Sequence, residues 1–162
     1  MSKVKTVRCG NNKATPYLRQ HKDLFTECVH AVDLACGNGR NSELLKEMGM
    51  HVMSLNAKND YGIKWLATNP IPVAAGEVDL VLCNYLLMFL DPHARNDVYD
   101  EITRVSHIGS KCMIELEKVK QSLIHEDDLL HALNDEVCAN MIQRGWRSIH
   151  GRRNHYIFEK IA

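Results

Sequence analysis

The stretch VDLACGNGRNS at residues 32–42 limits the folds open to this chain more than any other feature of its sequence. An apolar run of strand length ends in Gly37-Asn38-Gly39, and residues 40–49 then space their apolar side chains as a helix does. Glycine permits the left-handed backbone that a tight bend requires. The stretch therefore predicts a β-strand, a glycine turn and an α-helix in immediate succession.

Strand-like and helix-like segments alternate along the rest of the chain. The predicted strands are residues 30–36, 51–56, 77–84 and 111–119, and the predicted helices are residues 14–28, 40–49, 91–106 and 125–145. The last segment, residues 146–162, predicts two short strands joined by a tight turn near 151–154. This order indicates an α/β fold with a doubly wound, mostly parallel, Rossmann-like sheet and a C-terminal antiparallel hairpin at one edge.

The connection between the second and third predicted strands is unusually short. Only 22 residues separate Asn56 from Asp79, and they comprise a helix-like stretch at 60–68 and a turn-rich stretch at 69–77. A full helix–strand–helix excursion hardly fits in this length, so the edge strand of the sheet is predicted to be missing or shortened. Because an uncovered sheet edge promotes association, a homodimer is expected there.

Length and charge narrow the class of protein. With 162 residues the chain is long enough for one core, so we expect a single domain over 1–162 that begins with a polar leader at 1–13. Twenty basic residues balance twenty acidic ones, and no apolar run is long enough to cross a bilayer. We therefore expect a cytoplasmic protein with no nucleic-acid or membrane partner.

Histidines and cysteines do not predict a metal site. The six cysteines form no CxxC pair, and the nine histidines are scattered with no HxxxH pair. We expect surface histidines and small buried cysteines in a reducing compartment, with no bound metal.

The glycine turn is more than a connection between two elements. In doubly wound sheets ligands bind at the carboxyl ends of strands, where Gly37 and Gly39 would expose bare backbone and the following helix would present its N–H groups. Asp33, inside the strand end, could accept from loop amides or from a ligand ammonium. A dinucleotide site needs a third glycine in G-x-G-x-x-G, which this turn lacks, so a pyrophosphate ligand is disfavoured.

The same residues resemble a known family. VDLACGNGRNS is similar to the D-x-G-x-G-x-G nucleotide loop of class I S-adenosylmethionine-dependent methyltransferases. Within that superfamily, CGNGRNS together with LLMFL at 86–90 resembles the tellurite-resistance type. The similarity covers roughly residues 30–160 in element order. It implies a Rossmann-like fold, S-adenosylmethionine as cofactor and methyl transfer to a small-molecule acceptor.

The resemblance also implies roles for nine residues. The methionine part of the cofactor would be surrounded by Asp33, Ala35, Gly37, Asn38 and Gly39. The ribose and adenine would lie beside Leu55 and Asn56, and the sulfonium would face Asn84 and Tyr85. Such sites act mainly by aligning donor, methyl and acceptor and by excluding water, so no general base is obligatory and no catalytic residue is predicted.

Three departures from the family pattern leave an alternative open. Asn56 stands where family members carry an acid for the ribose hydroxyls, with Asp60 as a possible substitute, and Ala35 stands where the loop has its first glycine. The short connection also reduces the adenine side of the site, where Trp65 could provide an aromatic lid. The alternative is a degenerate member that binds the cofactor, a related nucleoside or a protein partner without catalysis.

Overall fold

The computed structural model describes residues 13–58 and 61–162. Its strands are β1 (His30–Leu34), β2 (His51–Asn56), β3 (Ile63–Lys64), β4 (Val78–Asn84), β5 (Ser106–Glu115), β6 (Trp146–Arg152) and β7 (His155–Lys160). Its helices are α2 (Pro16–His21), α3 (Arg40–Glu47), α4 (Pro92–Val105) and α5 (Asp127–Gln143), with the 3-10 helices η2 (Lys22–Phe25) and η3 (Leu87–Phe89). The predicted leader lies, apart from Lys13, outside the described residues.

The strands form one sheet in the order β3-β2-β1-β4-β5-β7-β6. Strands β3, β2, β1, β4 and β5 are parallel, and β7 is antiparallel to both β5 and β6. The predicted fold class is therefore confirmed, including the C-terminal hairpin. Since β1 lies between β2 and β4, the strand order reverses at β1 and β4, which marks the place where ligands bind in such sheets.

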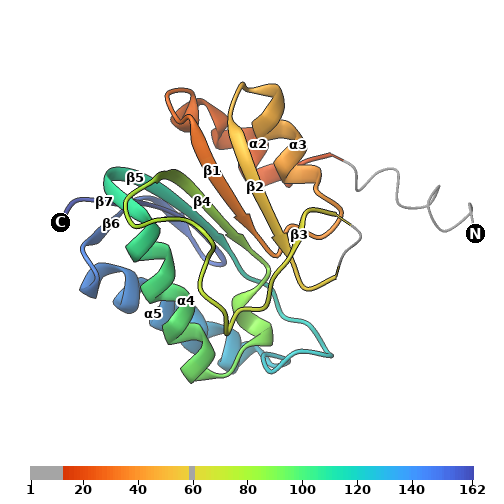
Figure 1. Cartoon of the computed structure of the whole chain (residues 1–162). Coiled ribbons are helices and arrows are strands. Elements are labelled where there is room, and N and C mark those ends of the chain that lie inside the picture. The colour runs from red at the N-terminus through yellow and green to blue at the C-terminus, as the bar shows by residue number, and fades with distance from the viewer. Residues whose placement is uncertain (1–12, 59–60) are drawn as a thin grey trace, which may run out of the picture.

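Helices cover the sheet on both faces (Figure 1). Helices α4 and α5 pack on one face over a core that includes Val81, Ile114 and Trp146, whereas α2 and α3 cover the other face, with Leu18, Phe25 and Leu45 buried there. Strands β4 and β5 have apolar side chains toward both layers, as expected of strands buried on both faces. Two separate apolar layers thus hold the central strands in place.

The first predicted helix is shorter than expected. Residues 14–28 were predicted as one helix, but α2 ends at His21 and continues only as the 3-10 helix η2 to Phe25. The first helical residue is Pro16, which lacks an N–H and suits this position. Phe25 is fully buried in the α2–α3 layer, and this anchor sets the end of η2.

The prediction of a missing or shortened edge strand is confirmed, because β3 has only two residues and pairs with the end of β2. The helix-like stretch at 60–68 is not helical in its described part, and the expectation of a helix there is wrong. Gly62 has a φ of +74°, and a Cβ on it would lie 2.3 Å from the Ser54 carbonyl oxygen. This close approach brings the chain against β2, where residues 63–64 pair as β3 instead of forming a helix.

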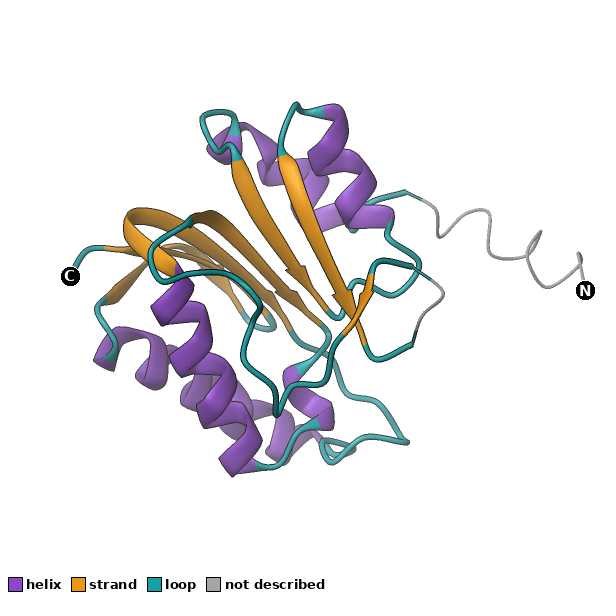
Figure 2. Cartoon of the chain, viewed as in Figure 1, coloured by secondary structure: helices purple, strands orange, loops and turns teal. Residues whose placement is uncertain are grey.

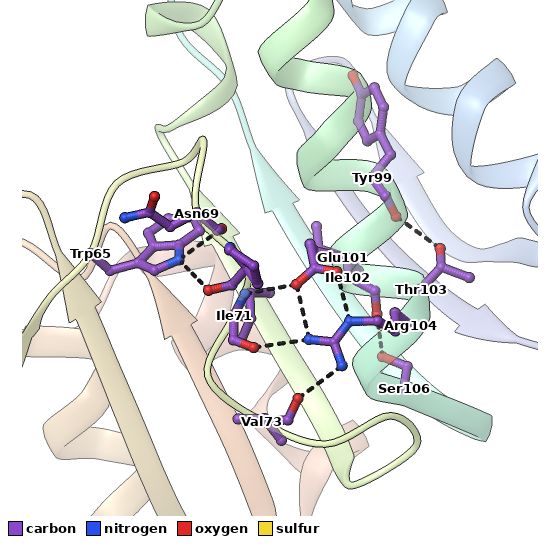
Figure 3. A network of polar contacts seen from close by, with 11 residues as sticks. Trp65, Asn69, Ile71, Val73, Tyr99, Glu101, Ile102, Thr103, Arg104 and Ser106 are labelled. Atoms are coloured by element: carbon purple, nitrogen blue, oxygen red, sulfur yellow. Dashed lines mark hydrogen bonds and ion pairs between the residues drawn. The ribbon is translucent and has the colours of Figure 1, made fainter.

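The chain from β3 to β4 runs as a loop beside α4 (Figure 2). Polar contacts tie this loop to the helix (Figure 3). Arg104 of α4 donates to the Ile71 and Val73 carbonyl oxygens, both at 2.9 Å, and Glu101 accepts from the Ile71 N–H at 2.7 Å. Arg104 also pairs with Glu101, and Trp65 donates to the Asn69 and Pro70 carbonyl oxygens. These contacts satisfy backbone groups that a helix would otherwise have satisfied internally.

Replacing Arg104 with Met should loosen this loop. The change keeps the apolar stem but removes the donors to Ile71 and Val73, so we expect the free energy of unfolding to fall by about 1–2 kcal/mol. Amide hydrogen exchange should accelerate mainly over residues 65–76. The control is Arg147→Met, because Arg147 pairs with Glu159 on the surface and such pairs contribute about 0–1 kcal/mol. Equal effects of the two changes would contradict the assigned role of Arg104.

Candidate functional site

Two adjoining cavities lie at the carboxyl ends of β1 and β4, and Ala35, Gly37, Asn38 and Tyr85 line both. The apolar cavity has a volume of about 700 Å³, and its other lining residues are Asn56, Ala57, Lys58, Trp65, Leu66, Ala67, Leu86, Phe89 and Leu90. The polar cavity has a volume of about 610 Å³, and its other lining residues are Thr15, Asp33, Cys36, Arg40, Asn41, Asn84 and Glu117. Together they form an elongated hollow with an apolar and a polar half.

Left-handed backbone shapes the wall between the two cavities. Among the described residues only three that are not glycine have a positive φ, and two of them, Ala35 and Tyr85, directly follow β1 and β4. Gly37, with a φ of +58°, faces open space where a Cβ would be. Strain of this kind costs about 1–3 kcal/mol at a residue other than glycine and clusters at functional sites. The two strand ends are thus bent so that backbone borders the hollow.

Gly39 serves packing rather than the cavities. Its φ is +82°, and a Cβ on it would lie 2.3 Å from the ring of Tyr61. Tyr61 in turn donates its hydroxyl proton to Glu43 of α3 and accepts a bond from Lys46. Gly39 therefore lets the segment after β2 close over α3, and it lines neither cavity.

Asp33 is a buried acid in the wall of the polar cavity. One carboxylate oxygen accepts from the Ser42 hydroxyl at 2.7 Å, and Ser42 also bonds Ser54 of β2 at 2.7 Å. Burial raises the pKa of Asp33 to about 7, and the hydrogen bonds from Ser42 offset only part of that rise. No cation pairs with Asp33 among the ion pairs of the described residues. A ligand ammonium in the polar cavity would supply the missing charge.

Asn84 carries unpaired polar atoms at the end of β4. The residue is only 6% exposed at the end of β4, yet neither the amide nitrogen nor the amide oxygen of its side chain has a hydrogen-bond partner. An unsatisfied buried polar group costs about 1–3 kcal/mol. Asn84 lines the polar cavity, so its unpaired amide lies in the wall that a bound molecule would contact.

Tyr85 lines both cavities, and its hydroxyl bonds a buried carboxylate. The hydroxyl donates to Glu115 at 3.2 Å, and the Tyr85 N–H donates to the Glu115 carbonyl oxygen at 2.8 Å. Burial and the neighbouring Glu115 carboxylate raise the pKa of Tyr85, so its hydroxyl stays protonated at neutral pH.

Seven of the nine predicted site residues line the hollow. Leu55 is fully buried beneath it and contributes only its carbonyl oxygen, which accepts from the Cys36 N–H at 2.9 Å. Asn56 lines the apolar cavity and donates to the Gly37 carbonyl oxygen at 3.4 Å. The alternative ribose ligand, Asp60, lies outside the described residues.

Several residues that line the polar half of the hollow were not predicted from the sequence. Thr15, Arg40, Asn41 and Glu117 line the polar cavity, and the buried Glu115 lies behind it. Glu115 had a signal in the sequence, because a carboxylate stands between apolar residues in the strand KCMIEL. Thr15 had no such signal in the sequence, because its only recognisable feature is its position before the first helix. Within residues 13–58 and 61–162, no cluster of three or more His, Cys, Asp or Glu is arranged to hold a metal ion.

Comparison with known proteins decides the family. The model of a family described as a methyltransferase domain matches residues 32–114, a span that contains the glycine turn, β4 and most of β5. The chain belongs to this methyltransferase family. The class I S-adenosylmethionine-dependent methyltransferase predicted from the sequence is thereby confirmed at the level of the family. No curated protein matches the chain.

Solved methyltransferase structures share the fold at low sequence identity. A TehB-like S-adenosylmethionine-dependent methyltransferase from Corynebacterium glutamicum has a TM-score of 0.67 and 14% identity, with 98% of this chain and 95% of that chain covered. The 1,6-didemethyltoxoflavin-N1-methyltransferase of Burkholderia thailandensis has a TM-score of 0.66 and 13% identity, with 90% of this chain and 76% of that chain covered. A methyltransferase from Archaeoglobus fulgidus has a TM-score of 0.64 and 18% identity, with 80% of this chain and 66% of that chain covered. This chain therefore spans just under two thirds of the length of that protein.

The unpaired amide of Asn84 predicts a stabilising substitution. Asn84→Leu removes two unsatisfied buried atoms, so the ligand-free methyltransferase should gain about 1 kcal/mol in its free energy of unfolding. Chemical denaturation without ligand measures this gain. The control is Asn134→Leu, because the Asn134 amide bonds Leu130, Asn154 and Tyr156 and its loss should cost about 2 kcal/mol or more. Destabilisation by both changes would show that Asn84 has partners in the free protein.

Asp33 predicts a pH dependence of stability. Its pKa is raised from 3.8 to about 7, so the folded protein holds this proton to a higher pH than the unfolded chain does. Its contribution to stability is complete at low pH and is lost as the pH rises from about 4 to about 7. Asp33→Asn should therefore become more stable than the native protein with rising pH, by on the order of 1 kcal/mol or more at pH 8. Parallel stability curves from pH 4 to pH 8 would contradict this assignment.

Proposed function

We propose that this protein transfers a methyl group from S-adenosylmethionine to a small acceptor. The observation that carries the proposal is the Asn84 side chain, which is buried and unpaired in the wall of the polar cavity at the point where the strand order reverses. A side-chain amide in this state is suited to a ligand that both donates and accepts hydrogen bonds. Membership of a methyltransferase family makes a sulfonium nucleoside the ligand of choice.

The two halves of the hollow fit the two halves of this cofactor. The apolar cavity, with Trp65, Leu66 and Ala67 on its wall, suits the adenine, and Asn56 lies where the ribose would be held. The polar cavity suits the amino-acid tail, with Asp33 for the ammonium and backbone at Gly37 and Asn38 beside the chain. The cofactor supplies an electrophilic methyl group when bound.

The chain's own contribution is to position the reactants and to exclude water. Tyr85 borders both cavities and Asn84 borders the polar one, so their side chains would flank the reacting atoms. Alignment of donor and acceptor in a dry site carries much of the rate in such transfers. The polar cavity, at about 610 Å³, suits a small acceptor beside the amino-acid tail.

We also propose the domain organisation, the partners, the location and the acceptor type of this protein. We infer that residues 1–162 form a single domain that acts on a small molecule, with no nucleic-acid partner and in the cytoplasm. The described residues contain no helix that is both long and apolar enough to cross a membrane.

The two-residue strand β3 leaves much of the β2 edge without a neighbour, which supports a homodimer through that edge. Likeness to the C. glutamicum TehB-like enzyme supports the tellurite-resistance type of acceptor site.

The second candidate is a degenerate member that binds the cofactor, a related nucleoside or a protein partner without transfer. Asn56 favours it, because an uncharged amide stands at the proposed ribose position and already bonds the Gly37 carbonyl oxygen at 3.4 Å. Assays for release of S-adenosylhomocysteine with candidate acceptors, tellurite and selenite among them, distinguish the two candidates.

Calorimetry with S-adenosylhomocysteine tests the binding step. Gly37→Ala should weaken binding by at least about 10-fold, because its new methyl group points into the open space of the hollow. Gly49→Ala is the matched control, since Gly49 also has a positive φ and open space around it but lies at the end of α3. Both changes force an L-residue into a left-handed conformation, which costs about 1 kcal/mol. Binding that is absent from the native protein, or equal in the two variants, would overturn the proposed site.

A further inference from the structure

Glu115, the last residue of β5, lies behind the wall of the polar cavity. Its side chain is fully buried, and it lines neither cavity itself. In the pairing of the strands, Glu115 lies opposite Asn84 of β4 on one side and opposite His155 of β7 on the other. A carboxylate in this position is therefore one layer away from the proposed site of methyl transfer.

Two hydroxyl groups from the cavity wall donate to this carboxylate. The Thr15 hydroxyl bonds one carboxylate oxygen at 2.8 Å, and the Tyr85 hydroxyl bonds the other at 3.2 Å. Thr15 and Tyr85 come from segments far apart in the sequence, and both line the polar cavity. Every hydroxyl-bearing side chain that lines this cavity thus points its proton at the same buried acid.

Histidine connects the carboxylate to solvent. The His155 Nδ1 atom lies 3.2 Å from the oxygen that Tyr85 bonds, and the His155 side chain is 25% exposed. Within the described part of the chain, no lysine or arginine pairs with Glu115. A buried acid without a permanent cation is costly to the fold, so its retention needs a reason beyond packing.

We propose that Glu115 is the proton acceptor for the methyl transfer, working through the Tyr85 hydroxyl, and that the acceptor molecule is protic. This inference rests on the proposed function. It commits to a neutral O–H, S–H or N–H acceptor, because only such a molecule has a proton to lose when it is methylated. Tyr85 touches the reacting molecule, whereas Glu115 acts through Tyr85.

The step balances in atoms and charge. The bond between the sulfonium sulfur and the methyl carbon breaks as the bond from that carbon to the acceptor heteroatom forms. The acceptor's proton moves to the Tyr85 oxygen, and the Tyr85 proton moves to Glu115, which becomes a neutral carboxylic acid. Glu115 then loses this proton to solvent beside the partly exposed His155 ring, which restores the carboxylate for the next turnover.

Charged and titratable groups around this path come from α2, β6, β7 and the segment after β5. The Tyr17 ring of α2 contacts the His155 ring in a tilted arrangement at 4.9 Å between centroids, and Arg152 of β6 lies over Tyr17. Burial raises the pKa of Tyr17 to about 12, so it stays neutral. Glu117, after β5, lines the cavity mouth. Only His155 among these groups contacts Glu115 directly, which leaves it as the exit.

Infrared spectroscopy tests the resting state without any acceptor. The difference spectrum between the native protein and Glu115→Gln, both with S-adenosylhomocysteine at neutral pH, should show a carboxylate band that the variant lacks. A protonated carboxyl band in its place would overturn the proposal, because a neutral acid cannot take up the proton. Calorimetry of both proteins should give the same affinity for S-adenosylhomocysteine, since Glu115 does not line the hollow.

Transfer assays test the role in turnover. We expect Glu115→Gln and Tyr85→Phe each to lower kcat on the order of 100-fold with protic acceptors such as phenols, alcohols and neutral thiols. Transfer to acceptors without a proton, such as dimethyl sulfide or iodide, should change little. Tyr156→Phe is the matched control, because its hydroxyl bonds Asn134 and not Glu115. If Glu115→Gln does not fold, Tyr85→Phe decides, since it removes one oxygen and keeps the ring.

The outcomes separate the inference from the function on which it rests. Equal losses with both acceptor classes would make Glu115 a structural residue and overturn the inference alone. Transfer by the native protein only to acceptors without a proton would do the same. A native protein that binds S-adenosylhomocysteine but methylates neither class would overturn the proposed transfer, and the inference with it.

Discussion

Reversal of the strand order at β1 and β4 is the constraint on which the rest of this molecule depends. Chains leaving the two strands turn to opposite faces of the sheet, toward α3 and η3, and so open a hollow between them. Positive φ values at Ala35, Gly37 and Tyr85 bend the chain sharply at the two strand ends and so shape that opening. The rigid sheet beneath fixes where those residues lie.

Two buried polar groups line this hollow, a third lies behind its wall, and each costs stability in the free protein. Asp33 has a raised pKa, Asn84 has no partner, and Glu115 has no permanent cation within the described residues. Apolar layers on both faces of the sheet offset that cost. Such groups are pre-arranged, so a ligand gains their hydrogen bonds without having to reorganise the site. The same features that weaken the free fold thus favour binding.

The short connection before β4 shows how the fold tolerates a missing helix. Arg104 and Glu101 on α4 bond the loop backbone at Ile71 and Val73, so its polar groups are satisfied without helical bonds. Trp65 is held by the Asn69 and Pro70 carbonyl oxygens and closes one side of the apolar cavity. One wall of the apolar cavity is therefore built from a clamped loop.

The sequence by itself determined the strand–turn–helix at residues 32–42, the alternating order of elements and the short edge, because hydrophobic period and glycine turns are local signals. Seven of the nine site residues predicted from it line the hollow. Only the tertiary structure decided that residues 61–68 form the two-residue strand β3 and turns rather than a helix, since Gly62 lies against β2. It alone brought Thr15, Tyr85 and His155 onto Glu115. Those contacts join positions up to 100 residues apart, and no local pattern encodes such a distance.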